Sequence, residues 1–139
     1  MELFLGGTCN NSNWRDQLIP LLKCDYFNPV VEDWTPECQE IELEKRASCN
    51  CILYVITPKM TGVYSIAEVV DDSNKRPEKT IFCYLTEDGD QKFTEGQIKS
   101  LNMVKRMVEE NGAYAFSTLA EIAEHVNTMK DFSDHYSKN

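Results

Sequence analysis

Residues 51–56 read CILYVI, an uninterrupted apolar run, and Pro58 follows shortly after it. A strand with one solvated face alternates apolar and polar residues, whereas a continuous apolar run is typical of a strand buried on both faces. Residues 80–85, TIFCYL, are nearly as apolar. Two such strands predict a parallel sheet that is covered by helices on both sides.

Working outward from these strands, the sequence alternates strand and helix from one end to the other. Further strands are expected at residues 3–5, 25–28 and 113–116. A first helix begins at Ser12 and is shortened or bent by Pro20, and later helices are expected at about 36–48, 64–73, 98–108 and 118–129. This order predicts one α/β domain over residues 1–130, a doubly wound, three-layer sheet of about five strands, with a polar tail at 131–139.

The composition narrows the range of functions. The chain has 139 residues and a net charge of −9, and an acidic chain repels phosphate backbones, so no nucleic-acid partner is expected. No secretory leader and no apolar run of roughly 20 residues is present in the sequence, which favours a cytoplasmic protein without a membrane partner. The six cysteines lack the paired spacing of a zinc site, so we expect no metal and no disulfide.

In doubly wound sheets, ligands bind beyond the carboxyl ends of the strands, where the strand order reverses. The first loop at that edge begins with Gly6 and Gly7 and continues through Asn10. Paired glycines allow a ligand to approach the backbone closely, and the following helix start suits an anion. The same residues also fit a tight turn between strand and helix, which the pattern alone favours.

The second loop at this edge contains Asn28 and ends at Trp34, directly before the Thr35-Pro36 helix start. The indole of Trp34 suits stacking on a flat ring such as a nucleobase. It suits a hydrophobic staple against the following helix equally well.

The third loop contains Gly62, Tyr64 and Ser65 and leads to Glu68. Gly62 can supply a turn that brings backbone amides to the site, and Ser65 can cap the helix or bind a ligand. We expect Glu68 in the first helical turn, where the helix dipole lowers the pKa of a carboxyl group, which suits a nucleophile. A glutamate that only complements the dipole is the simpler reading of this position.

The helix at 36–48 is rich in acids, namely Glu37, Glu40, Glu42 and Glu44, and most of them are expected on a solvated face with Lys45 or Arg46. Chemistry at a glycosidic carbon often uses two carboxylates in different environments, and this helix can supply the second. Arg15 and Lys59 are candidate phosphate contacts, or simply solvated cations. His125 is read as a surface residue, and no Ser-His-Asp or Cys-His arrangement is evident.

Four stretches together suggest a family. They are LFLGG at 3–7, YFNPVVEDW at 26–34, CNCILYVITP with TGVYSIAE at 49–68, and NGAYAFSTLAEIAEHV at 111–126. In this order and spacing the chain resembles the nucleoside 2-deoxyribosyltransferase-like proteins.

The resemblance implies a flavodoxin-like sheet and a retaining reaction at C1′ of a nucleoside or nucleotide, without a cofactor. Glu68 falls on the position of the nucleophile, and Glu42 falls where relatives carry an aspartate that assists proton transfer. Gly6 and Gly7 match the loop that lines the sugar site. We predict that Asn10, Asn28, Trp34, Gly62, Tyr64 and Ser65 complete the substrate site. The resemblance also implies a homo-oligomer.

The chain departs from the family pattern at two positions. Phe4 stands where transferases often carry a tyrosine, and Gly62 stands near the position of an aspartate. These departures favour an alternative, a binding module that senses or sequesters a nucleotide-derived ligand with little or no turnover. A structural role on a common fold is the third reading.

Overall fold

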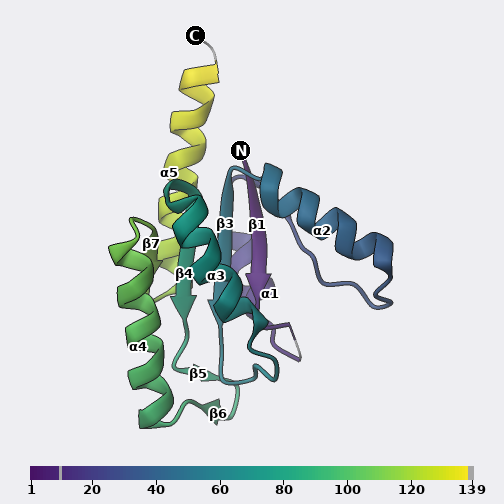
Figure 1. The fold of residues 1–139 in the computed structure, drawn as a ribbon. Coiled ribbons are helices and arrows are strands. Elements are labelled where there is room, and N and C mark those ends of the chain that lie inside the picture. Colours follow the sequence, from purple (N-terminus) through teal and green to yellow (C-terminus); the bar gives the residue numbers. More distant parts are fainter. Residues whose placement is uncertain (10, 138–139) are drawn as a thin grey trace.

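The computed structural model describes residues 1–9 and 11–137, with side chains as far as residue 129 (Figure 1). Its elements are, in chain order, β1 (Glu2–Gly7), α1 (Trp14–Leu18), η1 (Ile19–Leu21), β2 (Asp25–Phe27), α2 (Pro36–Ser48), β3 (Cys51–Ile56), α3 (Tyr64–Lys75), η2 (Pro77–Lys79), β4 (Thr80–Tyr84), β5 (Glu87–Asp88), β6 (Gln91–Lys92), α4 (Glu95–Glu110), β7 (Tyr114–Phe116) and α5 (Leu119–Ser137).

The main sheet has five parallel strands in the order β2-β1-β3-β4-β7. The chain adds strands in one direction from β1 to β2 and then, from β3 onward, in the other. This order is that of a flavodoxin-like fold, and the prediction of a doubly wound, three-layer α/β sheet is confirmed. The reversal lies between β1 and β3, where Leu5 pairs with Leu53 and Gly7 with Val55.

Two apolar cores fill the spaces on either side of the sheet. All six residues of β3 are buried, as the CILYVI run predicts. Its odd-numbered residues pack against Trp14 of α1 and Ile122 of α5, and its even-numbered residues pack against Val69 of α3 and Leu101 of α4. Figure 1 shows α3 and α4 on the near side of the sheet. The alternation of side chains along a strand distributes the apolar run between two helix layers.

Local sequence signals set the helix ends. Pro20 stops α1 early and leaves a short 3-10 turn, η1. Thr35 caps α2, because its Oγ1 accepts a hydrogen bond from the Cys38 amide at 3.3 Å. Thr94 and Gln97 form a capping box at the start of α4, directly before Ile98, the first apolar residue on the buried face of the helix.

Two features differ from the sequence-based expectations. The helix expected to end near Met129 continues to Ser137, so much of the predicted tail is helical. A short antiparallel hairpin, β5–β6, was not predicted, because its two-residue strands carry no apolar run. The hairpin is tied to the first loop, since Ser12 Oγ donates to Asp88 Oδ2 at 2.6 Å.

Helix α2 stands apart from the compact body in Figure 1. Arg46 is its one buried residue, whereas Ile41 and Leu43 are exposed. The predicted bounds of α2 are confirmed, and polar contacts join it to the rest of the chain, including Arg46 with Asp72 and Lys45 with Glu2. Within residues 1–9 and 11–137, no helix is long and apolar enough to cross a bilayer.

Candidate functional site

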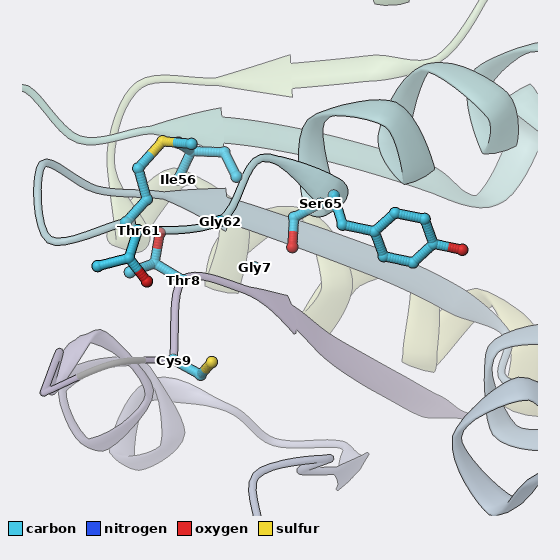
Figure 2. Close-up of a pocket in the computed structure, with 9 residues that line it drawn as sticks. Gly7, Thr8, Cys9, Ile56, Thr61, Gly62 and Ser65 are labelled. Atoms are coloured by element: carbon cyan, nitrogen blue, oxygen red, sulfur yellow. The ribbon is translucent and has the colours of Figure 1, made fainter. Parts of the chain in front are cut away.

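Two adjoining cavities open at the carboxyl ends of β1 and β3. The larger has a volume of about 360 Å³ and the smaller about 280 Å³, and they share Gly7, Cys9, Tyr64 and Ser65 as walls. Figure 2 shows the smaller cavity, with Gly7 and Thr8 facing Gly62 and Ser65 across it. Both cavities therefore lie at the reversal of strand order, where such sheets bind ligands.

The cavities bring together most of the residues predicted for the site. The described residues around the larger cavity are Phe4, Gly6, Gly7, Cys9, Arg15, Pro29, Val30, Val31, Trp34, Glu42, Tyr54, Tyr64, Ser65 and Glu68. Gly62 lines the smaller cavity. Asn28 lines neither of them, and its Oδ1 accepts from the Val30 amide at 3.1 Å, which closes a local turn. Asn10 lies outside the described residues.

The paired glycines are required by the sheet itself. A Cβ on Gly7 would lie 2.0 Å from the Val55 carbonyl oxygen, and its φ is +116°. A Cβ on Gly6 would lie 3.0 Å from the Leu53 carbonyl oxygen and 3.1 Å from the Tyr54 ring. Gly62 differs, because a Cβ there would meet nothing within 4 Å and its φ is not positive. Close strand approach therefore explains Gly6 and Gly7, whereas no steric constraint explains Gly62.

Aromatic side chains stand at the mouth of the larger cavity. Trp34 is 60% exposed and Tyr64 is 72% exposed, and both contribute to the cavity wall. An indole buried as a hydrophobic staple would be largely covered. Trp34 therefore leaves most of its ring open beside the cavity.

Glu68 projects from α3 toward the cavity, but not in the way the sequence predicted. Val63 is the N-cap, so Ser65 is not, and Glu68 falls in the second turn rather than the first. Its side chain is only 13% exposed. Burial raises the pKa of Glu68 to about 7, opposed by the charge of Arg46 and assisted by those of Glu42 and Asp72. The expectation of a lowered pKa was wrong, because desolvation outweighs the helix dipole.

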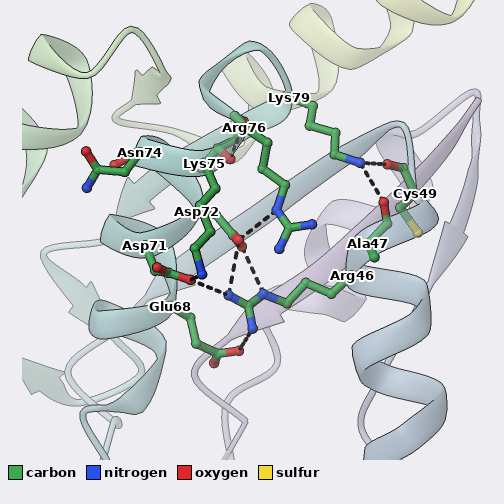
Figure 3. A network of polar contacts seen from close by, with 12 residues as sticks. Arg46, Ala47, Cys49, Glu68, Asp71, Asp72, Asn74, Lys75, Arg76 and Lys79 are labelled. Atoms are coloured by element: carbon green, nitrogen blue, oxygen red, sulfur yellow. Dashed lines mark hydrogen bonds and ion pairs between the residues drawn. The ribbon is translucent and has the colours of Figure 1, made fainter.

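Arg46 is the main partner of this carboxylate. Its Nη1 lies 3.3 Å from Glu68 Oε2, and its Nε and Nη2 donate to the two oxygens of Asp72 at 2.9 and 3.1 Å (Figure 3). Arg46 was expected on a solvated face, but it is 8% exposed. The expectation that Arg46 is solvated was wrong because its partner Asp72 lies on α3. The sequence pattern of α2 cannot show that contact.

Glu42 lies on the opposite wall of the larger cavity, on α2. Burial raises its pKa, against the nearby positive charges of Arg46 and Arg15. The other acids of the helix, Glu37, Glu40 and Glu44, are exposed, as predicted. One carboxylate of the acid-rich helix is thereby brought to the same cavity as Glu68.

Arg15 forms hydrogen bonds with backbone carbonyl groups of β1 and the first loop. It is 6% exposed, and its Nε and Nη2 donate to the Leu5 carbonyl oxygen at 3.1 and 2.9 Å while Nη1 donates to that of Thr8 at 2.8 Å. Burial lowers the pKa of Arg15 to about 10. The sequence left Arg15 open between a phosphate contact and a solvated cation. In the structure its guanidinium donates to carbonyl groups at the end of β1 and in the following loop, and its side chain also lines the larger cavity.

The match to a known family covers this whole site. The family model described as nucleoside 2-deoxyribosyltransferase like matches residues 1–87. The chain belongs to this family. Every described residue that lines the two cavities falls inside the matched range, and the stretch at 111–126 that contributed to the resemblance falls outside it. No curated protein matches the chain significantly.

Other polar groups lie away from these two cavities. His125 lines a separate cavity with Phe116 and Glu121. Its Nε2 is buried with no hydrogen-bond partner among the described residues, and its ring packs against Tyr114 and Phe116. His125 was read as a surface residue, and its side chain is half-buried, with the ring edge at Nε2 covered. The described residues contain no cluster of three or more acidic, histidine or cysteine side chains placed to hold a metal ion.

Proposed function

We propose that the protein cleaves the N-glycosidic bond of a nucleoside or nucleotide and passes the sugar to another base or to water. The observation that carries this proposal is the position of Glu68. Its carboxyl group lines a cavity at the switch point of the sheet, in a chain of the nucleoside 2-deoxyribosyltransferase-like family. The volume of the larger cavity, about 360 Å³, suits a small ligand.

In the proposed first step, a Glu68 oxygen forms a bond to C1′ while the bond from C1′ to the base nitrogen breaks. The electron pair of that bond stays on the base, which takes up a proton. In the second step, a base nitrogen or a water oxygen attacks C1′ and passes its proton to Glu42, and Glu68 leaves as a carboxylate. A carboxylate nucleophile thus divides one difficult displacement into two easier ones and stabilises the positive charge that develops at C1′.

Glu42 is the proposed proton donor to the departing base. Burial raises the pKa of Glu42 from its ordinary value, and this is the direction that an acid catalyst needs. Glu68 needs the opposite state, and its pKa of about 7 implies that the nucleophilic form becomes dominant only above neutral pH. We therefore expect the rate to rise with pH through about 7.

The substrate is proposed to lie with its sugar near Gly6 and Gly7 and its base beside Trp34. Both glycines and Trp34 line the larger cavity, and the exposed indole offers a flat surface on which a base can stack. Ser65 and Tyr64, which line both cavities, are proposed contacts for hydroxyl groups of the ligand.

The test is to incubate the protein with deoxynucleosides, deoxynucleotides and NAD, with and without a second free base, and to follow the bases by chromatography. Free or exchanged base is expected from the wild type and not from Glu68→Gln. Glu44→Gln, an exposed glutamate on α2, is the matched control and should retain activity. A slow, fluorinated nucleoside should leave a sugar adduct on the peptide that contains Glu68, detected by mass spectrometry. Absence of turnover and of adduct for every ligand would refute the proposal.

One contact favours a second function, a module that binds a nucleotide-derived ligand without turnover. The ion pair between Arg46 and Glu68, at 3.3 Å, stabilises the negative charge of the carboxylate and so reduces its nucleophilicity. Phe4, which replaces the usual tyrosine, lines the same cavity and offers no hydroxyl group. Retained ligand binding in Glu68→Gln, together with no turnover by the wild type, would establish this function.

We also propose that the protein forms a homo-oligomer through α2. Ile41 and Leu43 are exposed on this helix, and Val30 and Val31 are exposed in the preceding loop. Exposed apolar side chains on a helix and its preceding loop suit an interface between copies. Light scattering after gel filtration should give more than one chain per particle, and Leu43→Glu should lower that number.

A further inference from the structure

We propose that Arg46 is a positioning residue for Glu68: its guanidinium, anchored by Asp72, orients the Glu68 carboxylate in the cavity and stabilises its ionised form. This inference rests on the proposed function for its role in the reaction. The contact that it describes is testable without any turnover.

The guanidinium of Arg46 divides its donors between two acids of α3. Nε and Nη2 form a forked pair with Asp72 at 2.9 and 3.1 Å, and Nη1 remains for Glu68 at 3.3 Å. Nη2 also lies 3.6 Å from Asp71. Figure 3 shows the guanidinium directed at Glu68, Asp71 and Asp72 together. A forked pair is more directional than a single contact, so it determines where Nη1 points.

Asp72 is itself held from three sides, so it is a rigid anchor. It is fully buried, and it accepts a hydrogen bond from the Tyr54 hydroxyl at 2.6 Å and from Arg76 Nε at 2.9 Å in addition to the Arg46 fork. Burial by itself raises the pKa of Asp72, but the hydrogen bonds from Arg46 and Tyr54 lower it overall. Asp72 is therefore a fixed negative charge to which Arg46 is attached.

Glu68 and Asp72 lie four residues apart on α3, on the same face of the helix. Two buried carboxylates so placed repel each other, and the cation between them offsets that repulsion. The groups that act on Glu68 are Arg46 and Glu42 from α2 and Asp72 from α3, with Tyr54 from β3 hydrogen-bonded to Asp72. Arg46 supplies the one positive charge among these groups.

Two substitutions should move the titration of Glu68 in opposite directions. Arg46→Gln removes the cation and leaves Glu42 and Asp72 facing Glu68, so the midpoint should rise by about one to three pH units. Asp72→Asn removes a negative charge and releases the attraction of Arg46 for Asp72, so the midpoint should fall. A purely structural role for Arg46 predicts no rise of the Glu68 midpoint in Arg46→Gln.

The experiment is a carbon-13 NMR titration of protein labelled at the glutamate side-chain carboxyl, with the Glu68 signal assigned by its loss in Glu68→Gln. Lys75→Gln is the matched control, because Lys75 pairs with Asp71 on the exposed side of α3 at 3.1 Å. It should leave the Glu68 midpoint in place. Arg46→Lys keeps the charge and should restore much of the wild-type midpoint, but not the forked pair with Asp72.

A Glu68 midpoint that is unchanged in a folded Arg46→Gln would overturn the inference. If Arg46→Gln does not fold, the same change is made in Asp72→Asn, where no buried Asp72 carboxylate needs a cation, and an equal Glu68 midpoint with and without Arg46 would overturn the inference. Where the wild type turns over substrate, the acid limb of the pH–rate profile should move with the NMR midpoint in each variant. A wild type without turnover would refute the proposed function alone, because the titration of Glu68 still reports on Arg46.

Discussion

Replacing Glu68 with glutamine should stabilise the folded protein at alkaline pH, although we expect it to abolish activity. Glu68 carries a largely covered carboxyl group, whose pKa is raised from its ordinary value of 4.5 to about 7. Between these two values the folded chain holds more protons than the unfolded chain. The free energy of unfolding therefore falls as pH rises through this window and stays lowered above it. Glutamine has nearly the same shape and no charge to desolvate.

The size of the effect follows from the two pKa values. For a single group, the loss in free energy of unfolding between about pH 5 and about pH 8 is about 2 to 3 kcal/mol. Glu68→Gln has no such loss. At alkaline pH it should therefore be more stable than the wild type by about that amount, and at acidic pH the two proteins should have nearly the same stability. The side chain is 13% exposed, so solvent screening reduces this figure only modestly.

Urea denaturation of both proteins at the two pH values measures the difference. Glu44→Gln, an exposed glutamate on α2, is the control and should show no pH-dependent gain. The reasoning fails if Glu68→Gln gains no stability over the wild type between the acidic and the alkaline condition. It also fails if the wild type is the more stable protein at alkaline pH, since the ionised carboxylate would then be stabilising.

Three further substitutions test other parts of the structure. Gly7→Ala should lower the free energy of unfolding by about 2 kcal/mol or more, because the added Cβ would lie 2.0 Å from a carbonyl oxygen of β3. Gly62→Ala should change it by less than about 0.5 kcal/mol, because a Cβ there meets nothing within 4 Å. Equal effects of the two substitutions in urea denaturation would contradict this reasoning. Trp34→Ala should raise KM about fivefold or more with little change in kcat or stability, and an unchanged KM would exclude stacking on the base. Arg15→Met should lower the free energy of unfolding by about 2 kcal/mol or more, because it leaves buried carbonyl groups without these donors. Arg106→Met, at an exposed position, is the control and should be nearly neutral when both variants are compared by thermal denaturation.

The fold was predictable because its signals are local. The apolar run at 51–56 identifies a strand buried on both faces, and Thr35 with Pro36 identifies a helix start. Such signals depend on residues within a few positions of each other. Their alternation along the chain then leaves few possible arrangements of the sheet. The β5–β6 hairpin was missed because it lacks these signals, and a contact between Ser12 and Asp88, far apart in sequence, attaches it.

The site was predictable only in part. The strand order reversal indicated which loops would meet, and Gly7, Trp34, Glu42 and Glu68 all line the larger cavity. The state of each side chain was not predictable. The Asn28 side chain accepts a hydrogen bond from the Val30 amide and does not line the cavity. Its orientation depends on the path of its own loop.

What the sequence determined by itself is the set of elements and the edge of the sheet where a ligand can bind. Only the tertiary structure decided which charges are buried there. Arg46 and Asp72 come from different helices, and neither helix pattern predicts the other's position. The pKa of Glu68 likewise depends on how far its carboxyl group is buried and on its distance from Arg46. Burial and charge interactions are properties of segments that meet in space, so they appear only when the chain is folded.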